Sequence, residues 1–297
     1  MPAFVMFHVK HRRTCVSRET LLAFPHACVY VKKEIGKGAL ILARIIAVAN
    51  QKGGVGKTTT SVNLSASLAI MENRVLLVDC DPQANSTSSL GFDQQNLPRN
   101  LYTALCGTST LEETLLPTAT PYLSLLPSST DLVGIEIELV DKMAREFYLA
   151  DLLGQVADNY DYIIIDCPPS LGLITINTLC AAHEILIPLQ CEFFALEGIV
   201  KLLHTYEQVR KRLNKELKIL GVLLTMYDSR NKLARQVKAE AERCFPKHMF
   251  KTVIPRNVRL SEAPSHGKSI LHYDIKSKGA EAYLELAREV VHKTALP

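Results

Sequence analysis

The sequence lacks a run of about 18 or more apolar residues, so it predicts no transmembrane helix. It also lacks any CxxC pair among its eight cysteines, which argues against a zinc site and against a disulfide framework. There is no internal repeat, and no linker is long enough to separate a second domain. We therefore expect a cytoplasmic protein with a single folded domain, whose cysteines are reduced and mostly buried.

Apolar segments that read as strands recur along most of the chain. An apolar content of 47% and a charged content of 22% are ordinary for a globular protein. Continuous apolar runs predict buried strands at 44–49, 74–79, 122–126, 162–166, 184–189, 219–225 and 252–254. Helical patterns lie between most of these runs, as at 61–71, whereas 91–121 predicts loops and short helices. This alternation predicts the α/β class, with a mostly parallel twisted sheet covered by helices on both faces.

The first predicted strand ends in a glycine-rich turn that leads directly into a helix, which is the context of a P-loop NTPase. Glycines let backbone N–H groups approach phosphates, and the helix N-terminus points at the same anions. The predicted nucleotide-binding residues are Gly53, Gly54, Val55, Gly56, Lys57, Thr58 and Thr59. We expect Lys57 to reach the β- and γ-phosphates and the Thr58 hydroxyl to bind Mg²⁺.

One position departs from the standard Walker A pattern. Its first glycine would fall at Gln51, and a second lysine, Lys52, stands five residues before Lys57. The run from Lys52 to Thr58 therefore resembles the deviant Walker A motif.

Two carboxylate motifs follow at the ends of predicted strands. The first is Asp79-Cys80-Asp81-Pro82-Gln83, and the second is Asp166-Cys167-Pro168-Pro169. A carboxylate at the carboxyl end of a parallel strand faces the nucleotide crevice. A capping or turn role is the alternative for each carboxylate.

These motifs together resemble the ParA/Soj family of chromosome-partitioning ATPases, within the MinD/ParA superfamily. The resemblance covers about residues 43–293, including Asn63-Leu64, the run 193–198 and the run 254–267. It implies that Lys52 reaches the nucleotide of a partner subunit, that Asp81 orients or deprotonates the attacking water, and that Asp166 holds Mg²⁺ with support from Asp79. It also makes Pro255 and Asn257 candidate contacts to the adenine base.

Charge is strongly segregated along the chain. Residues 42–200 hold seven basic and eighteen acidic residues, whereas 201–278 hold eighteen basic and seven acidic residues, a net charge of +11. Such asymmetry predicts a polyanion-binding face, although a solvated surface is the alternative. Arg230 stands where the family has a DNA-contact arginine, and the further candidates are Lys232, Arg235, Arg256 and Arg259. Few aromatic residues interleave these charges, so we expect no base stacking.

The resemblance implies an ATP-dependent homodimer that binds double-stranded DNA without sequence preference and hydrolyses ATP slowly until a ParB-type protein stimulates it. The implied location is the cytoplasm, in association with the nucleoid and not with a membrane. Alternatives are a MinD-like membrane ATPase, a regulator of replication initiation, and a small-molecule ligase or kinase of the same fold. A nitrogenase-iron-protein-like reductase would need cysteines that bind its cluster. It is disfavoured because Cys167 is followed by Pro168-Pro169 and does not begin a Cys-Gly-Gly turn.

The first 41 residues show no clear helical or strand period. Two pentapeptides, starting at Phe7 and at Val16, match what the palindrome TGTTTCACGTGAAACA encodes in two frames. That palindrome is similar to the centromere-like site beside which ParA/Soj proteins act. We therefore expect residues 1–41 to be a non-native extension, with translation starting at Leu42 and the ATPase domain spanning 42–297. A genuine, disordered basic arm is the alternative, and N-terminal mass spectrometry of the native protein distinguishes the two.

Overall fold

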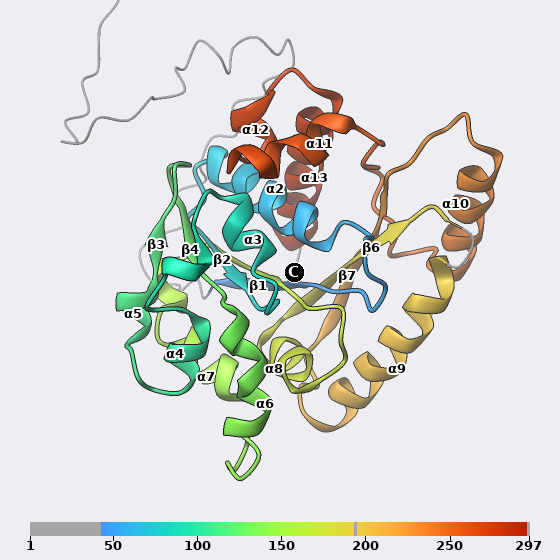
Figure 1. The fold of residues 1–297 in the computed structure, drawn as a ribbon. Helices are drawn as coiled ribbons and strands as arrows, with labels where there is room; N and C mark the ends of the chain where they lie inside the picture. The colour runs from blue at the N-terminus through green and yellow to red at the C-terminus, as the bar shows by residue number, and fades with distance from the viewer. Residues whose placement is uncertain (1–42, 193–194, 296–297) are drawn as a thin grey trace, which may run out of the picture. The chain divides into compact units, whose positions relative to one another are not determined.

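A seven-stranded sheet forms the centre of the fold in the computed structural model, which describes residues 43–192 and 195–295 (Figure 1). The strand order is β3-β4-β2-β5-β1-β6-β7, and every neighbouring pair except β3–β4 is parallel. The strands are β1 (Arg44–Val48), β2 (Val75–Asp79), β3 (Leu116–Pro117), β4 (Leu123–Leu126), β5 (Tyr162–Asp166), β6 (Glu184–Gln190) and β7 (Lys218–Thr225). The predicted α/β class is confirmed, whereas the predicted extension and domain start lie outside the described residues.

Twelve described helices surround the sheet, together with four short 3-10 turns. The helices are α2 (Lys57–Ile70), α3 (Asn85–Ser89), α4 (Leu101–Leu105), α5 (Leu111–Thr114), α6 (Ile135–Glu138), α7 (Tyr148–Gly154), α8 (Leu173–Ala181), α9 (Ala195–Arg212), α10 (Lys232–Cys244), α11 (Val258–Glu262), α12 (Ile270–Tyr273) and α13 (Lys278–Ala295). The 3-10 turns are η1 (Gln94–Asn96), η2 (Thr130–Gly134), η3 (Ala157–Asn159) and η4 (Ala263–His266).

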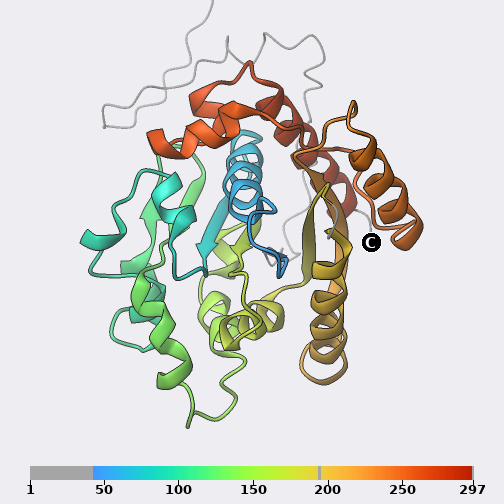
Figure 2. The same ribbon diagram turned by 45° about the vertical axis from the view of Figure 1, so that its right-hand side comes forward.

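Both faces of the sheet are buried. Successive strand residues point to opposite sides, and both sets of side chains lie in a core. In β1, Ile46 and Val48 join the core beneath α2, α12 and α13, whereas Ile45 and Ala47 join the core that α7, α8 and α9 cover. The turned view in Figure 2 shows these two helical layers on either side of the strands. Burial on both faces explains why the strands read as continuous apolar runs and not as alternating ones.

The segment before Pro255 differs from its predicted structure. Residues 252–254 form no regular strand, although the backbone N–H of Ile254 donates to Leu224 at 2.8 Å beside β7. The reason is that Glu289 of α13 accepts hydrogen bonds from the backbone N–H groups of Lys251 and Thr252, at 2.9 and 3.0 Å. A side chain therefore takes donors that a strand would need.

The short strand β3 was not predicted, because two residues that include Pro117 give no periodic signal. It pairs antiparallel with β4 within a region that otherwise has the predicted loops and short helices.

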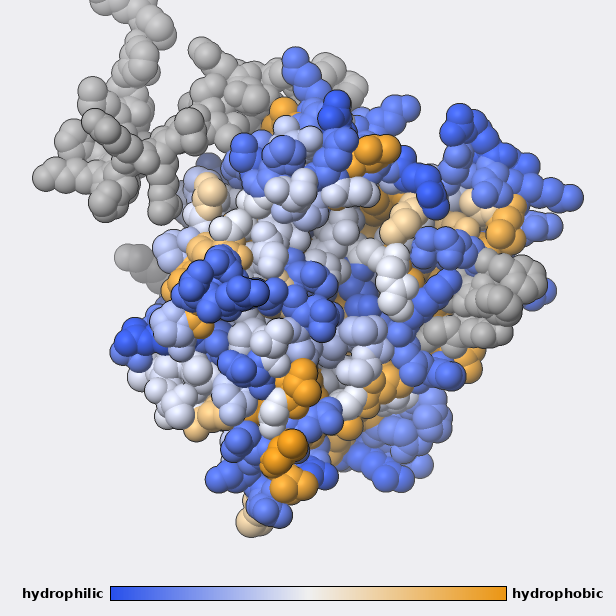
Figure 3. Space-filling model, viewed as in Figure 1, coloured by the Kyte–Doolittle hydropathy of each residue, from blue (hydrophilic) through white to orange (hydrophobic). Residues whose placement is uncertain are grey.

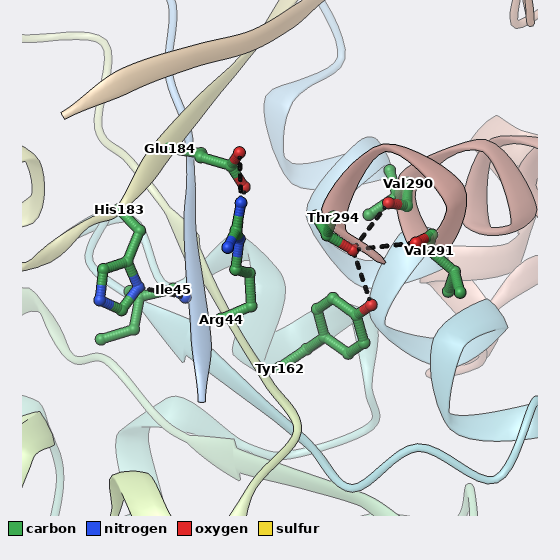
Figure 4. Close-up of polar contacts among 8 residues, drawn as sticks. All are labelled: Arg44, Ile45, Tyr162, His183, Glu184, Val290, Val291 and Thr294. Carbon is green, nitrogen blue, oxygen red and sulfur yellow. Dashed lines mark hydrogen bonds and ion pairs between the residues drawn. The ribbon is translucent and has the colours of Figure 1, made fainter. Parts of the chain in front are cut away.

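Polar contacts fasten the amino-terminal edge of the sheet, as Figure 4 shows. Arg44 of β1 donates two hydrogen bonds to the buried Glu184 of β6, at 3.0 and 2.9 Å. His183 accepts a hydrogen bond at Nδ1 from the backbone N–H of Ile45, at 3.0 Å. Burial lowers the pKa of His183, and the nearby charge of Arg44 lowers it further. This edge is therefore held by an ion pair and by a histidine that accepts a backbone hydrogen bond.

Two glycines from distant loops meet beside the carboxyl edge of the sheet. Gly91 follows α3 and Gly267 follows η4, and both have left-handed backbone angles, with φ of 86° and 61°. A Cβ on Gly267 would lie 2.6 Å from the Gly91 Cα, so no side chain fits at Gly267 without a backbone shift. The loop after α3 is thus packed directly against the loop after η4.

Candidate nucleotide-binding site

The loop between β1 and α2 has the shape that its glycines predict. Gly54 and Gly56 take left-handed conformations, with φ of 75° and 87°, which other residues adopt at a cost. Thr225 of β7 donates to the carbonyl oxygen of Val55 at 2.8 Å, and Asn50 donates to that of Pro188 at 2.7 Å. Hydrogen bonds from β6 and β7 therefore fix the loop, with α2 beginning at its end.

The two lysines of the motif lie in different environments. Lys57 is buried, and its Nζ lies 3.4 Å from the carbonyl oxygen of Lys52, inside the curve of the loop. Burial lowers the pKa of Lys57, against the opposing effect of the Asp166 charge. Lys52 is partly exposed, and its Nζ pairs with Glu192 at 3.3 Å. One lysine thus points inward and the other lies on the open side.

Asp79 and Asp166 come together because β2 and β5 are paired in register, with Asp79 opposite Asp166. Asp79 is fully buried and accepts two hydrogen bonds from Thr87, through its backbone N–H and its hydroxyl, each at 2.8 Å. Burial raises the pKa of Asp79, and the Asp166 charge raises it further. Asp79 thus lies buried beside Asp166, and its predicted support of the Mg²⁺ site stays a prediction.

Asp166 lies nearest the start of α2. It accepts hydrogen bonds from Ser61 at 3.0 Å and from Ser86 at 2.8 Å, and the Thr58 hydroxyl lies near enough to favour its charged form. Burial raises the pKa of Asp166, and these hydroxyl groups oppose that effect. Ser61, Ser86 and Thr87 were missed in the sequence, because serine and threonine at such positions carry no specific signal.

The donor set fits magnesium. Mg²⁺ is usually bound by one or two carboxylates together with phosphate oxygens and water, not by a cage of protein ligands. Thr58 and Asp166 supply a hydroxyl and a carboxylate at the mouth of the phosphate loop, and the described residues contain no cluster of three His, Cys, Asp or Glu side chains that would compete. Thr58 and Asp166 would therefore hold the ion, with Asp79 behind them.

Asp81 follows β2 in a tight turn that ends at Ala84, whose φ is 50°. Its side chain is largely buried and accepts a hydrogen bond from the backbone N–H of Gln83 at 3.0 Å. The turn therefore holds the Asp81 carboxylate at the carboxyl edge of the sheet, where its predicted role with water stays a prediction.

A pocket of about 210 Å³ lies on the other side of the phosphate loop. Its lining combines the start of α2 with the predicted base contacts. Lining residues include Gly56, Thr59, Thr225, Met226, Pro255, Asn257 and Tyr283. Asn257 also accepts a hydrogen bond from the backbone N–H of Arg259 as it caps α11. Pro255 and Asn257 thus line a pocket next to the phosphate loop, and their contact with the base stays a prediction.

The predicted DNA-contact residues come from two adjoining segments, joined by a hydrogen bond from the backbone N–H of Tyr227 to Ile254. Arg230 is 89% exposed and forms a bidentate ion pair with Asp228. Lys232 begins α10, and Arg256 lines the base pocket.

The remaining two predicted DNA-contact residues, Arg235 and Arg259, also contact groups of the protein itself. Arg235 donates to the carbonyl oxygen of Ser229 at 2.7 Å. Arg259 pairs with Glu262 and Asp274, at 2.8 and 3.5 Å.

None of the described helices is both long and apolar enough to cross a membrane.

The fold and site together define a P-loop ATPase with a second lysine in its phosphate loop. A family described as an AAA domain matches residues 43–219. The chromosome partitioning protein ParA of Myxococcus xanthus is 54% identical over 257 residues, which cover 86% of this chain and 91% of that protein. The sporulation initiation inhibitor protein Soj of Bacillus subtilis is 54% identical over 249 residues, covering 84% and 98%. The chain belongs to the ParA/Soj family of chromosome-partitioning ATPases.

Solved structures agree with this fold. A structure described as cobyrinic acid a,c-diamide synthase from Mycobacterium smegmatis, with bound ADP and magnesium, matches with a TM-score of 0.77 and 39% identity, covering 86% of this chain and 96% of that one. Its name denotes a different reaction, but the partitioning proteins are closer in sequence. Family membership confirms the predicted fold class, the ATPase activity, and ATP and Mg²⁺ as the ligands.

Proposed function

We propose that this chain is an ATP-dependent dimerising switch that binds double-stranded DNA non-specifically and drives chromosome or plasmid partitioning with a ParB-type partner. The observation that carries the proposal is the position of Lys52. Its amine lies on the open side of the phosphate loop and pairs with the exposed Glu192, a contact that it can exchange for one in a second subunit. The protein acts in the cytoplasm, in association with the nucleoid.

Nucleotide binding follows from the loop. Backbone N–H groups of residues 53–59 and the N-terminus of α2 hold the phosphates, and Lys57 exchanges its contact with the Lys52 carbonyl for phosphate oxygens. Bound Mg²⁺ supplies positive charge next to the phosphates. The pocket beside Pro255 and Asn257 takes the base. The Asp81 carboxylate orients the attacking water and accepts its proton.

Dimerisation is the switch. The γ-phosphate provides contacts that ADP cannot make, and the free energy of these contacts favours the closed dimer. Lys52 leaves Glu192 and crosses to the partner's nucleotide. Hydrolysis is slow in the absence of the ParB-type partner, because the lifetime on DNA is the useful output.

DNA binding uses the face that carries Arg230, Lys232, Arg235, Arg256 and Arg259. Lysine and arginine neutralise DNA phosphates and release counterions, which requires no base readout. Closing two copies of this face into one dimer doubles the number of phosphate contacts, so ATP-dependent dimerisation raises the affinity for DNA.

The test is binding to non-specific duplex DNA with ATP, with ADP or without nucleotide, at two salt concentrations, for wild type, Lys52→Ala and Lys215→Ala. We expect tight, salt-sensitive binding only with ATP, its loss in Lys52→Ala, and wild-type behaviour in Lys215→Ala, which removes an exposed lysine far from the loop in sequence. ATP-dependent binding by Lys52→Ala would contradict the dimer mechanism. Binding that ignores nucleotide, or no binding, would favour a membrane or small-molecule ATPase.

A further inference from the structure

The segment that spans η2 and α6 has two apolar faces. Its inner side chains, Leu132, Ile135 and Leu139, are buried in the core. Its outer side chains are Val133, Ile137, Val140 and Met143, which are 65%, 77%, 55% and 92% exposed. Val133 lies in η2 and Ile137 in α6, whereas Val140 and Met143 lie in the segment that follows α6. Figure 3 shows apolar side chains gathered over α6. We call the four outer side chains the α6 stripe.

Carboxylates surround the α6 stripe. Residues 131–143 contain the single basic residue Lys142 and four acidic residues. The acidic residues are Asp131, Glu136, Glu138 and Asp141, all of them exposed. None of the four forms an ion pair within the described part of the chain. An apolar stripe with an acidic rim fits an amphipathic helix that carries basic residues. The same acidic rim would repel an anionic lipid surface.

One of these carboxylates connects the stripe to the nucleotide site. Glu136 accepts a hydrogen bond from the backbone N–H of Leu173 at 2.9 Å, where α8 begins. Its carboxylate also packs closely on Gly172, since a Cβ there would lie 2.1 Å from its Oε1. A single loop separates Leu173 from Asp166, so this hydrogen bond connects α6 with the loop that follows the predicted Mg²⁺ ligand.

We propose that the α6 stripe is the docking surface for a basic amphipathic helix of the protein that stimulates hydrolysis, and that Glu136 transmits docking to the Asp166 loop. Val133, Ile137 and Val140 anchor the helix, and the acidic rim pairs with its basic residues. Glu136 acts as a positioning residue. The inference rests on the proposed function, because it assigns a surface to the ParB-type partner.

The first experiment separates docking from the rest of the switch. ATP hydrolysis is measured with saturating ATP and duplex DNA while the ParB-type protein of the same genome is titrated. The variants are Ile137→Ser/Val140→Ser and, as a matched control, Val200→Ser, which is 65% exposed on α9. We expect the double variant to need at least 10-fold more partner, with basal hydrolysis and ATP-dependent DNA binding unchanged, and Val200→Ser to match wild type.

The second experiment tests transmission. Glu136→Ala removes the acceptor for the Leu173 N–H, whereas Glu136→Gln keeps an amide oxygen in its place. We expect Glu136→Ala to bind the partner with a similar half-saturating concentration but to lose several-fold in maximal stimulated rate, and Glu136→Gln to recover most of that rate. A merely structural role for Glu136 would lower basal and stimulated rates together, which would overturn the transmission step.

Three results contradict the docking surface. Undiminished stimulation of Ile137→Ser/Val140→Ser would show that the partner binds elsewhere. Loss of the ATP-dependent dimer in that variant, measured by light scattering, would assign the stripe to a second copy of this chain. A wild-type protein that the partner does not stimulate would refute the partner arm of the proposed function together with this surface, so the two failures can be told apart.

Discussion

At the scale of single residues, two glycines of the phosphate loop show the effect of backbone conformation separately from the effect of steric crowding. Gly53 and Gly54 are neighbours, and an added Cβ would meet nothing within 4 Å at either position. Only Gly54 has a left-handed φ, of 75°. The two glycines therefore differ in conformational demand and not in available room.

We expect Gly54→Ala to lower the free energy of unfolding by about 1–2 kcal/mol without nucleotide, because an L-residue is strained in this conformation. Gly53→Ala is the matched control and should cost less. Thermal unfolding of the nucleotide-free protein measures both. Equal losses in the two variants would mean that space, not φ, limits these positions.

The Lys52–Glu192 ion pair gives a second prediction at this scale. Glu192 holds Lys52 on its own subunit, at 3.3 Å, and dimerisation has to break that contact. We expect Glu192→Gln to dimerise at a several-fold lower ATP concentration, since the pair is exposed and worth at most about 1 kcal/mol. Light scattering against ATP concentration tests this, with Glu216→Gln as the control. An unchanged or higher midpoint would show that Glu192 does not restrain Lys52.

The sequence was most informative for residues whose chemistry is bound to a spacing. Lys57, Thr58 and Asp166 could be found because glycines and strand ends fix their surroundings. The hydroxyls of Ser61, Ser86 and Thr87 could not, since their role depends on which strands become neighbours. The bond from Glu136 to Leu173 was equally hidden, because it joins residues 37 apart through one side chain.

At the scale of elements, the strands buried on both faces could be predicted, because burial makes them uniformly apolar. The segment at 252–254 was apolar as well, yet it is not a strand. Glu289 takes its backbone donors, and no local pattern announces a partner from a distant helix. Elements at the rim of a sheet are thus decided by tertiary contacts.

His183 at the amino-terminal edge should make stability depend on pH. Its folded pKa is lowered, so between the folded value and the unfolded value of about 6.5 the unfolded state binds more protons. Its contribution is therefore complete above about pH 6.5 and is lost as the pH falls towards the folded pKa. We expect wild type to lose more thermal stability than His183→Gln between pH 7.5 and 5.5, with the exposed His204→Gln as control. Parallel losses in all three proteins would exclude this role.

At the scale of the whole molecule, part of the positive charge that the sequence gathers in residues 201–278 is already paired with carboxylates. Arg230 is paired with Asp228, and Arg259 is paired with Glu262 and Asp274. DNA phosphates therefore compete with these carboxylates for both arginines.

Salt dependence measures that competition. If Arg230 contacts one phosphate, Arg230→Ala should reduce the slope of log K against log salt by about 1 in the ATP state. Lys215→Ala, on the turn between α9 and β7, should leave the slope unchanged. Equal slopes for wild type and Arg230→Ala would remove Arg230 from the DNA face.

The contact between Gly91 and Gly267 has a consequence for how this chain can evolve. Most tight contacts tolerate drift, because a larger residue on one side can be compensated by a smaller one on the other. Here both partners already have no side chain, so no compensating substitution exists. The loop after α3 and the loop after η4 therefore constrain each other at these two positions. A lineage could alter what either loop binds only through the residues around these two positions.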